Sequence, residues 1–463
     1  MSEIELNPIV RRFAERSPLP VMARAIVERC LSAQQLDEWF ERQAQGQYTR
    51  ELLFSSVYEL MTQVVLGQQP SVHAAVRAAG EAITVSATSV YNKLGALEAG
   101  TSAALVGWSA AQAVELIQAL QAAKPALLPG LRVKVLDGNV LDGREHRLKE
   151  SRSRTAAPLP GKVVAVFDPQ CEVIEAIVPS EDAYTQERAL LPEVLGRHVG
   201  PGQLWLADRN FCTTAFLQGL VHRQAHALLR EHGQLRFTPL EPMREIGSSE
   251  GAQVGEQWVH LGAADQAATA LKVRRIRLKL PQPTRDGDDT LCLLTTLGSE
   301  HADALTLARL YRQRWTIERA FLHLTTQLRC EVRTLSYPGA ALFALACAMT
   351  AFNVLAVLKA ALRAAHGLAA EQSLSGYYMA IELGNAAQSL TTLVDPEDWI
   401  AFRLASTVAM AAWLRMQAQR LDLARYRKSV RGPQKPAVKR VHDPHQPHFS
   451  VARVLQQRKT QSP

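Results

Sequence analysis

The chain has 463 residues, of which 47% are hydrophobic, and its formal net charge at pH 7 is +8. This length exceeds that of one ordinary domain and allows a substantial core, so we expect two to four structural units. The charge favours a polyanionic partner, although +8 is modest when spread over the whole surface. The six cysteines form no CxxC pair, which argues against a zinc ribbon or a disulfide framework and favours free, buried thiols.

Positive charge is concentrated near the C-terminal end. From Ala411 to Pro463 the sequence has twelve Lys or Arg and two Asp, a net charge of +10, so the remainder is close to neutral. Residues 431–463 are rich in Pro and charge and are predicted to form a flexible basic tail. The first residues lack the apolar segment of a signal peptide, which favours a cytoplasmic protein. The uncharged stretch 334–358 is Ala-rich and contains Pro338 and Asn353, so we expect a buried core helix and not a membrane span.

Residues 1–125 are predicted to form a helical N-terminal domain. Apolar residues recur at helical spacing in ELLFSSVYELMTQVVLG and in AALVGWSAAQAVELIQALQAA. The segment between them, SATSVYNKLGALEAG, contains Asn92 and Lys93, which could face a phosphate backbone. A generic helical bundle and a domain that binds DNA ends are equally good interpretations of this pattern.

Residues 126–232 are predicted to form the first part of an α/β catalytic core. Three short strands, LRVKVLDGNVL, GKVVAVFD and CEVIEAIVP, suggest an antiparallel meander. A helix, the strand QLWLADRN, a second helix and the strand AHALLRE follow. The order β-β-β-α-β-α-β is that of the ribonuclease H-like fold, in which a mixed sheet presents carboxylates at its strand ends.

The remaining residues continue this pattern. Strand-like segments in 233–298 predict a β-rich insertion, and a long helix is expected from about Ala302 to Leu328. Residues 299–365 therefore supply the second part of the core, and 366–430 form a helical C-terminal region.

Two aspartates stand at the ends of predicted neighbouring strands. Asp137 ends one strand and is followed by Gly138, which leaves its carboxylate little covered; Asp208 ends another and is followed by Arg209. An aspartate at a strand end is usually only a turn former. Two of them on adjacent strands, however, can share Mg²⁺ ions, which prefer oxygen ligands and can stabilise both oxygens of a phosphodiester exchange.

A third carboxylate lies on the predicted helix that contains YRQRWTIERAFLHL. At about 100° per residue, Tyr311, Arg314, Glu318 and Thr325 fall within a stripe about 60° wide. Glu318 could then reach the metal ions while Tyr311 and Arg314 bind phosphate oxygens. The opposing residues are expected to pack; they are Leu310, Trp315, Ile317, Phe321 and Leu324. A plain surface helix with an Arg314–Glu318 ion pair explains the same spacing.

At these residues the chain resembles the DDE transposases of bacterial insertion sequences, in the subgroup with a Tyr-x2-Arg-x3-Glu-x6-Lys signature. YRQRWTIERAF carries the Tyr, Arg, Trp, Ile and Glu of that family in register. The DG at residues 137–138 and the DRNF at 208–211 resemble its two other acidic motifs. Further agreement comes from REHRLKE at 144–150, LPGK at 159–162 and Phe352-Asn353, so that the resemblance spans about residues 50–430. Thr325 stands where the signature has Lys, which removes one phosphate contact and leaves the carboxylates intact.

The resemblance implies a cut-and-paste DNA transposase. Asp137, Asp208 and Glu318 would be both catalytic residues and ligands of two Mg²⁺ (or Mn²⁺) ions, with cleavage at inverted-repeat ends and transfer of the 3′-OH into target DNA. A nucleoid-associated homodimer would pair the two double-stranded ends. The residues expected to contact DNA are Tyr311, Arg314, Arg209, Arg147 and Lys149. Arg147 and Lys149 belong to a basic loop with Arg144, Arg152 and Arg154 that is expected to grip DNA, unless it is only solvated.

Two other functions fit the same sequence. One is a metal-dependent nuclease of the same fold that cuts without strand transfer. The other is a non-catalytic DNA-binding repressor derived from a transposase, which Thr325 favours. The intact set of three carboxylates disfavours the repressor, because carboxylates near DNA phosphates repel them.

Overall fold

The computed structural model describes residues 4–46, 51–262, 270–284, 287–326, 328–429 and 432. The chain divides into two compact units, Met1–Tyr426 and Arg427–Pro463, and the described helices and strands all lie in the first. The predicted basic tail falls outside the described residues, apart from Gly432. The domain boundaries proposed from the sequence stay predictions.

The chain begins with seven helices, as the apolar spacing predicts. They are α1 (Pro8–Arg16), α2 (Pro18–Leu31), α3 (Ala33–Gln43), α4 (Phe54–Val65), α5 (Val72–Ala79), α6 (Ala87–Gly95) and α7 (Ala99–Ala119). Local sequence sets several of their starts. Ser32 and Gln35 form a capping box at α3, and the Ser86 hydroxyl accepts a hydrogen bond from the Ser89 N–H at α6.

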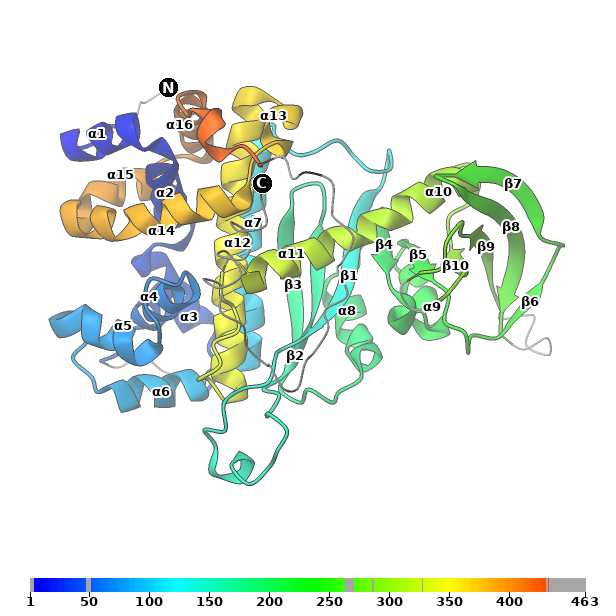
Figure 1. Cartoon of the computed structure of the whole chain (residues 1–463), viewed down its shortest axis with the longest axis horizontal. Coiled ribbons are helices and arrows are strands. Elements are labelled where there is room, and N and C mark those ends of the chain that lie inside the picture. Colours follow the sequence, from blue (N-terminus) through cyan, green and yellow to red (C-terminus); the bar gives the residue numbers. More distant parts are fainter. Residues whose placement is uncertain are drawn as a thin grey trace, which may run out of the picture. The chain divides into compact units, whose positions relative to one another are not determined.

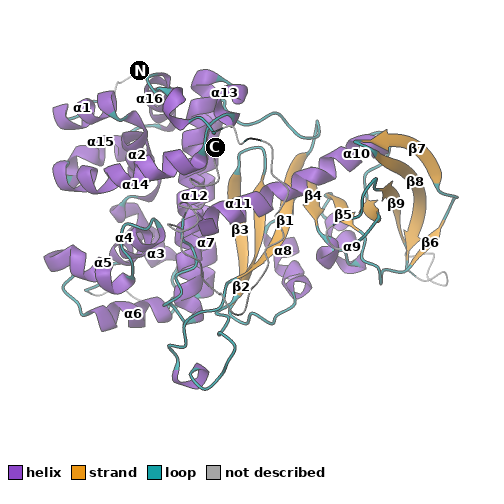
Figure 2. Cartoon of the chain, viewed as in Figure 1, coloured by secondary structure: helices purple, strands orange, loops and turns teal. Residues whose placement is uncertain are grey.

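The centre of the molecule is a mixed β-sheet with the predicted element order. Its elements are β1 (Arg132–Val140), β2 (Lys162–Asp168), β3 (Val173–Ser180), α8 (Leu191–Arg197), β4 (Gln203–Ala207), α9 (Thr214–His222) and β5 (His226–Arg230). Strands β1, β2 and β3 form an antiparallel meander, whereas β4 is parallel to both β1 and β5. This arrangement is the ribonuclease H-like α/β core that the sequence predicts (Figure 2).

The β-rich insertion extends the central sheet. Its strands are β6 (Phe237–Pro239), β7 (Arg244–Ser249), β8 (Ala252–Leu261), β9 (Leu271–Lys279) and β10 (Thr290–Thr295). Strand β10 pairs with both β5 and β9, so the main path of the ten-stranded sheet runs β3-β2-β1-β4-β5-β10-β9-β8-β6. The insertion is thus hydrogen-bonded to the core through β10.

Two apolar cores sandwich the sheet, because residues alternate between its faces along each strand. Val133 and Val135 of β1 face the larger core, which includes the long helices, while Leu136 faces a smaller core with α8 and α9. The same alternation places Leu204 and Leu206 of β4 on the first face. By continuation, Asp137 and Asp208 belong to the face of the larger core.

The C-terminal half is helical and shares the larger core with the N-terminal helices. It contains α10 (Ala304–Tyr311), α11 (Trp315–Thr326), α12 (Pro338–His366), α13 (Leu368–Gln372), α14 (Gly376–Leu393), α15 (Ile400–Leu404) and α16 (Thr407–Gln419). Helix α12 packs against α2, α4, α7 and α16 (Figure 1). By length and composition alone it could cross a membrane, but 78% of its most apolar window is buried inside the protein, as a core helix requires.

The cysteines behave as the sequence predicts. All six are free thiols, five are buried and Cys292 is half-buried. Burial raises the pKa of the Cys30 thiol to about 12, which leaves it protonated and unreactive at neutral pH.

Candidate active site

Asp137 and Asp208 lie side by side at the edge of the sheet. Leu136 of β1 pairs with Ala207 of the parallel strand β4, so the two aspartates follow at the next position on strands about 4.8 Å apart. The carboxylate of Asp137 accepts a hydrogen bond from the Gly138 N–H at 3.0 Å. The predicted juxtaposition of these two residues is therefore present, but the prediction that Asp137 ends its strand is wrong, because β1 continues to Val140 in antiparallel pairing with β2.

Glu318 comes from α11, which packs against β1. The long helix predicted over 302–328 is interrupted, because residues Arg312–Arg314 form a 3-10 turn between α10 and α11. The uniform 100° rotation per residue therefore does not hold across this segment. The break places Glu318 in the first turn of α11, where the helix dipole stabilises a carboxylate.

Arg314 joins two of the three carboxylates. Its Nη2 lies 2.6 Å from Glu318 Oε1 and its Nη1 lies 3.4 Å from Asp137 Oδ2. Arg314 is buried, whereas the side chain of Glu318 is 51% exposed. The Arg314–Glu318 ion pair expected of a plain surface helix is thus present. The Arg314 guanidinium also contacts the carboxylate of Asp137 on β1, however, which a plain surface helix does not explain.

The pKa of Asp137 reflects the charged residues that lie around it. The pKa of the Asp137 carboxyl is raised to about 6, mainly by burial, and the charges of Glu318 and Asp208 contribute to the increase. Arg314 and the Gly138 N–H oppose this increase. The three carboxylates therefore act on one another from different elements of the fold.

The donor set suits a hard divalent cation, since it offers carboxylate oxygens alone. Within the described ranges, no three His, Cys, Asp or Glu side chains are close enough together to hold a metal ion. The guanidinium of Arg314 provides the positive charge between Asp137 and Glu318 instead. Asp137, Asp208 and Glu318 are the carboxylates that would hold such an ion, and Glu318 would first have to leave Arg314.

Tyr311 and Trp315 depart from the roles predicted for them. The Tyr311 side chain is buried, and its hydroxyl donates a hydrogen bond to the backbone oxygen of Ala207 at 3.4 Å. It therefore supports the strand that ends at Asp208 and is not free to orient a phosphate. Trp315 was expected to pack but is 56% exposed, while Ile317, Phe321 and Leu324 are buried as predicted.

The predicted DNA contacts have different environments. Arg209 follows Asp208 directly and is exposed, and Lys149 is exposed in the 3-10 turn Lys149–Ser151. Arg147 is exposed and forms an ion pair with Glu145 at 2.6 Å. Arg144 is only 2% exposed, so it cannot grip DNA as the basic-loop hypothesis required. The proposed DNA contact of Lys93 is also unsupported, because its ammonium donates to the backbone oxygen of Leu52 and lies over the Phe40 ring.

Sequence reasoning missed Glu187, which lies against the backbone of Gly138 on the opposite face of the sheet from the Asp137 side chain. A Cβ at Gly138 would come within 2.1 Å of Glu187 Oε1, so the Glu187 carboxylate lies directly against the backbone next to Asp137. Glu187 begins a 3-10 turn, Glu187–Leu190, before α8. The glycine is therefore explained by the close approach of Glu187, and a lone glutamate about 50 residues from Gly138 gives no sequence signal of that contact.

Comparison with known proteins finds a family model that is similar to the central part of the chain. Residues 129–353, which contain Asp137, Asp208 and Glu318, match the family model described as Transposase DDE domain. No curated protein matches the chain in sequence. A solved structure, a piggyBac transposase synaptic complex with hairpin DNA, aligns over 94% of this chain and 90% of that chain, with 10% identity and a TM-score of 0.38.

Proposed function

Because residues 129–353 match a transposase DDE domain, we propose that the chain is a DNA transposase that cuts at the ends of its element and joins the freed 3′-OH to target DNA. The subgroup of bacterial insertion sequences is part of this proposal and rests on YRQRWTIERAF. The observations that support it are that Asp137 and Asp208 lie beside each other on the parallel strands β1 and β4, and that Arg314 links Asp137 to Glu318 of α11.

In the proposed mechanism, Asp137, Asp208 and Glu318 hold two Mg²⁺ or Mn²⁺ ions, which when bound supply an activated water and charge stabilisation for the phosphoryl exchange. Arg314 releases Glu318 and turns to a non-bridging phosphate oxygen, which its planar guanidinium can bind through two N–H groups. Tyr311 fixes the end of β4 through its hydrogen bond to Ala207 and so holds Asp208 in place. Burial of Asp137 limits the water around the reacting phosphate.

Double-stranded DNA is the proposed partner. The exposed Arg209 stands next to the carboxylates, and the exposed Arg147 and Lys149 extend the positive charge along the loop after β1. Such contacts give affinity that falls with salt and is independent of sequence. A homodimer that pairs two element ends, localised to the cytoplasm with the nucleoid, belongs to the same proposal because the reaction needs two ends.

The experiment that tests the proposal is incubation of the purified chain with labelled DNA carrying the element ends, with and without Mg²⁺. Asp208→Ala is compared with Asp289→Ala, which removes an exposed carboxylate from the β9–β10 loop. We expect metal-dependent cleavage and joining to a target plasmid, abolished by Asp208→Ala and retained by Asp289→Ala. Cleavage without joining would indicate a nuclease. End binding without cleavage, unchanged by metal, would indicate a repressor.

A further inference from the structure

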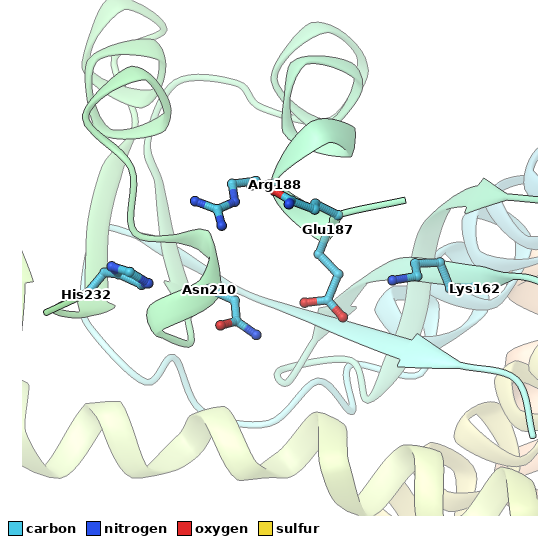
Figure 3. A pocket seen from close by; sticks show the side chains of 6 residues that line it. Lys162, Glu187, Arg188, Asn210 and His232 are labelled. Carbon is cyan, nitrogen blue, oxygen red and sulfur yellow. The ribbon is translucent and has the colours of Figure 1, made fainter. Parts of the chain in front are cut away.

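A recess of about 330 Å³ lies behind the three carboxylates. Its wall includes Glu187, whose carboxylate lies where the Cβ of Gly138 would point, whereas the neighbouring Asp137 faces the other side of the sheet. Figure 3 shows the side chains that line it, which come from the start of β2, the turn before α8, the turn after Asp208 and the residues that follow β5. They are Lys162, Gln186, Glu187, Arg188, Asn210 and His232.

Lys162 is the strongest indication that the recess takes a ligand. The residue is 8% exposed, and its side chain extends into the recess (Figure 3). Among the described residues its ammonium has no hydrogen bond or ion pair, and it is not fully buried but borders the open recess. An anion that enters the recess would therefore gain a charge-assisted hydrogen bond from an ammonium that no carboxylate neutralises.

The other side chains narrow the chemistry of that ligand. Lys162 and Arg188 supply two positive charges against the single carboxylate of Glu187, which favours a singly charged anion. His232 Nδ1 accepts a hydrogen bond from the Gln234 N–H, so in the neutral ring Nε2 carries the proton and can donate.

The carboxylate and the volume argue against a simple phosphate site. Glu187 repels a phosphate but accepts hydrogen bonds from the amino group of a base, as acidic side chains do with cytosine. The volume of 330 Å³ is at the lower end of small-molecule sites, about 300–1,000 Å³, and exceeds what a lone phosphate needs. A nucleotide, in which a phosphate is joined to a polar base, would contact both the cationic side chains and the Glu187 carboxylate.

We propose that the recess binds one unpaired nucleotide, with its phosphate on Lys162 and Arg188 and an amino group of its base on Glu187. This inference rests on the proposed function for the source of that nucleotide. Asn210 is two residues from Asp208, and Glu187 touches the residue after Asp137. A DNA strand with its scissile phosphate at the carboxylates therefore reaches the recess with a nearby nucleotide, which must be unpaired because a base inside a duplex cannot enter.

Binding without metal tests the inference. Fluorescence anisotropy is measured with a labelled duplex that ends in a short single-stranded extension, and with the same duplex ending blunt. Lys162→Met and Arg188→Ala are expected to weaken binding of the extended duplex about ten- to a hundredfold, the effect of a lost charged hydrogen bond, and to leave the blunt duplex unchanged. The matched control is Arg197→Ala on α8, whose exposed guanidinium pairs with Glu193. Equal binding by the exposed-residue variant Arg188→Ala and the control would overturn the inference, even if Lys162→Met fails to fold.

Competition identifies the ligand chemistry and its source. Deoxycytidine monophosphate is expected to displace the extended duplex from the wild-type chain, and Glu187→Ala, which removes the acceptor oxygens, is expected to remove its advantage over thymidine monophosphate. Inorganic phosphate competing as well as the nucleotides would refute the base contact. If the extended duplex gains nothing over the blunt one while the mononucleotide binds, the DNA source is refuted.

Cleavage of element ends is measured on the same preparations, so that failure of the transposase proposal and failure of the nucleotide-site proposal can be distinguished. Mg²⁺-dependent cleavage with no effect of Arg188→Ala on extended-duplex binding would retain the transposase and remove the nucleotide site. Nucleotide binding that depends on Arg188, in a chain that does not cleave DNA, would support the nucleotide site and reject the transposase proposal.

Discussion

Substituting Arg314 by Met tests whether its charge stands in for a metal ion between the carboxylates. The guanidinium pairs with Glu318 at 2.6 Å and Asp137 at 3.4 Å. Exposed ion pairs contribute about 0–1 kcal/mol, and breaking fully buried ones costs about 3–5 kcal/mol. Since the Glu318 side chain is 51% exposed and that of Asp137 is 17% exposed, we expect Arg314→Met to lower the free energy of unfolding by about 1–2 kcal/mol without metal.

Divalent metal should reverse this loss. With Arg314 removed, Glu318 is free to join Asp137 and Asp208, so Mg²⁺ is expected to stabilise the variant more than the wild-type chain. A ligand at a hundred times its Kd adds about 2.7 kcal/mol, which urea unfolding with and without Mg²⁺ resolves easily. End cleavage is nevertheless expected to fall about 10²–10³-fold, as on loss of a group that stabilises transition-state charge.

The control for this experiment is Arg312→Met. Arg312 lies in the same 3-10 turn, is more exposed and pairs with Glu250 away from the carboxylates. If Arg314→Met and Arg312→Met show the same stability in the absence of metal and the same response to Mg²⁺, the assigned role of Arg314 is wrong.

Three further substitutions test the packing that supports the site. Glu172 forms ion pairs with lysine and arginine side chains that hold its carboxyl pKa at about 2, below the usual 4.5. The stabilisation that these ion pairs give is therefore present above about pH 4.5 and is lost as pH falls towards 2. Glu172→Gln should lower the free energy of unfolding at pH 7 by up to about 3 kcal/mol. In urea titrations the variant should lose less stability than the wild-type chain as pH falls over this range. Gly339→Ala places a Cβ 2.4 Å from the backbone oxygen of Leu97 and should destabilise by more than about 2 kcal/mol, as overpacking does; a thermal midpoint equal to that of the open-site control Gly196→Ala would contradict this. Trp315→Ala should cost less than Ile317→Ala, a fully buried residue expected to lose about 2–5 kcal/mol, and the opposite ranking in denaturant unfolding would show that Trp315 packs.

The sequence predicted the central sheet and the meeting of its two aspartates well. The strands around Asp137 and Asp208 are apolar and bounded by Gly, Pro and polar residues, and Asp208 directly follows its strand, whereas β1 continues past Asp137 to Val140. The ribonuclease H-like order then determines that these strands are neighbours, and the β1–β4 register bears this out.

The helix with Glu318 was less predictable. No Gly or Pro marks the break at Arg312–Arg314, so periodicity alone extends α10 into α11. The break leaves Trp315 exposed and Tyr311 buried against β4, which reverses the roles assigned to them. Tertiary packing against the end of β4 decides these two positions, and no local pattern encodes it.

The recess could not be derived from sequence at all. Lys162 and Glu187 belong to separate elements whose approach depends on the fold, and each has a composition typical of a solvated loop or strand end. Gly138 carried a signal, since it departs from the β-branched residues favoured in strands. Only the structure shows that the signal concerns Glu187.

The central claim is that Asp137, Asp208 and Glu318 act as one metal-binding unit, and a double-mutant cycle on Mg²⁺-dependent end cleavage tests it most directly. Rates are measured for Asp137→Asn, Glu318→Gln and the double variant, with folding checked by thermal unfolding. Groups that act as a unit are not additive, so we predict that each single change lowers cleavage to the same residual rate and that the double variant is no slower than either. Independent, additive losses, or full cleavage by Glu318→Gln, would contradict the account.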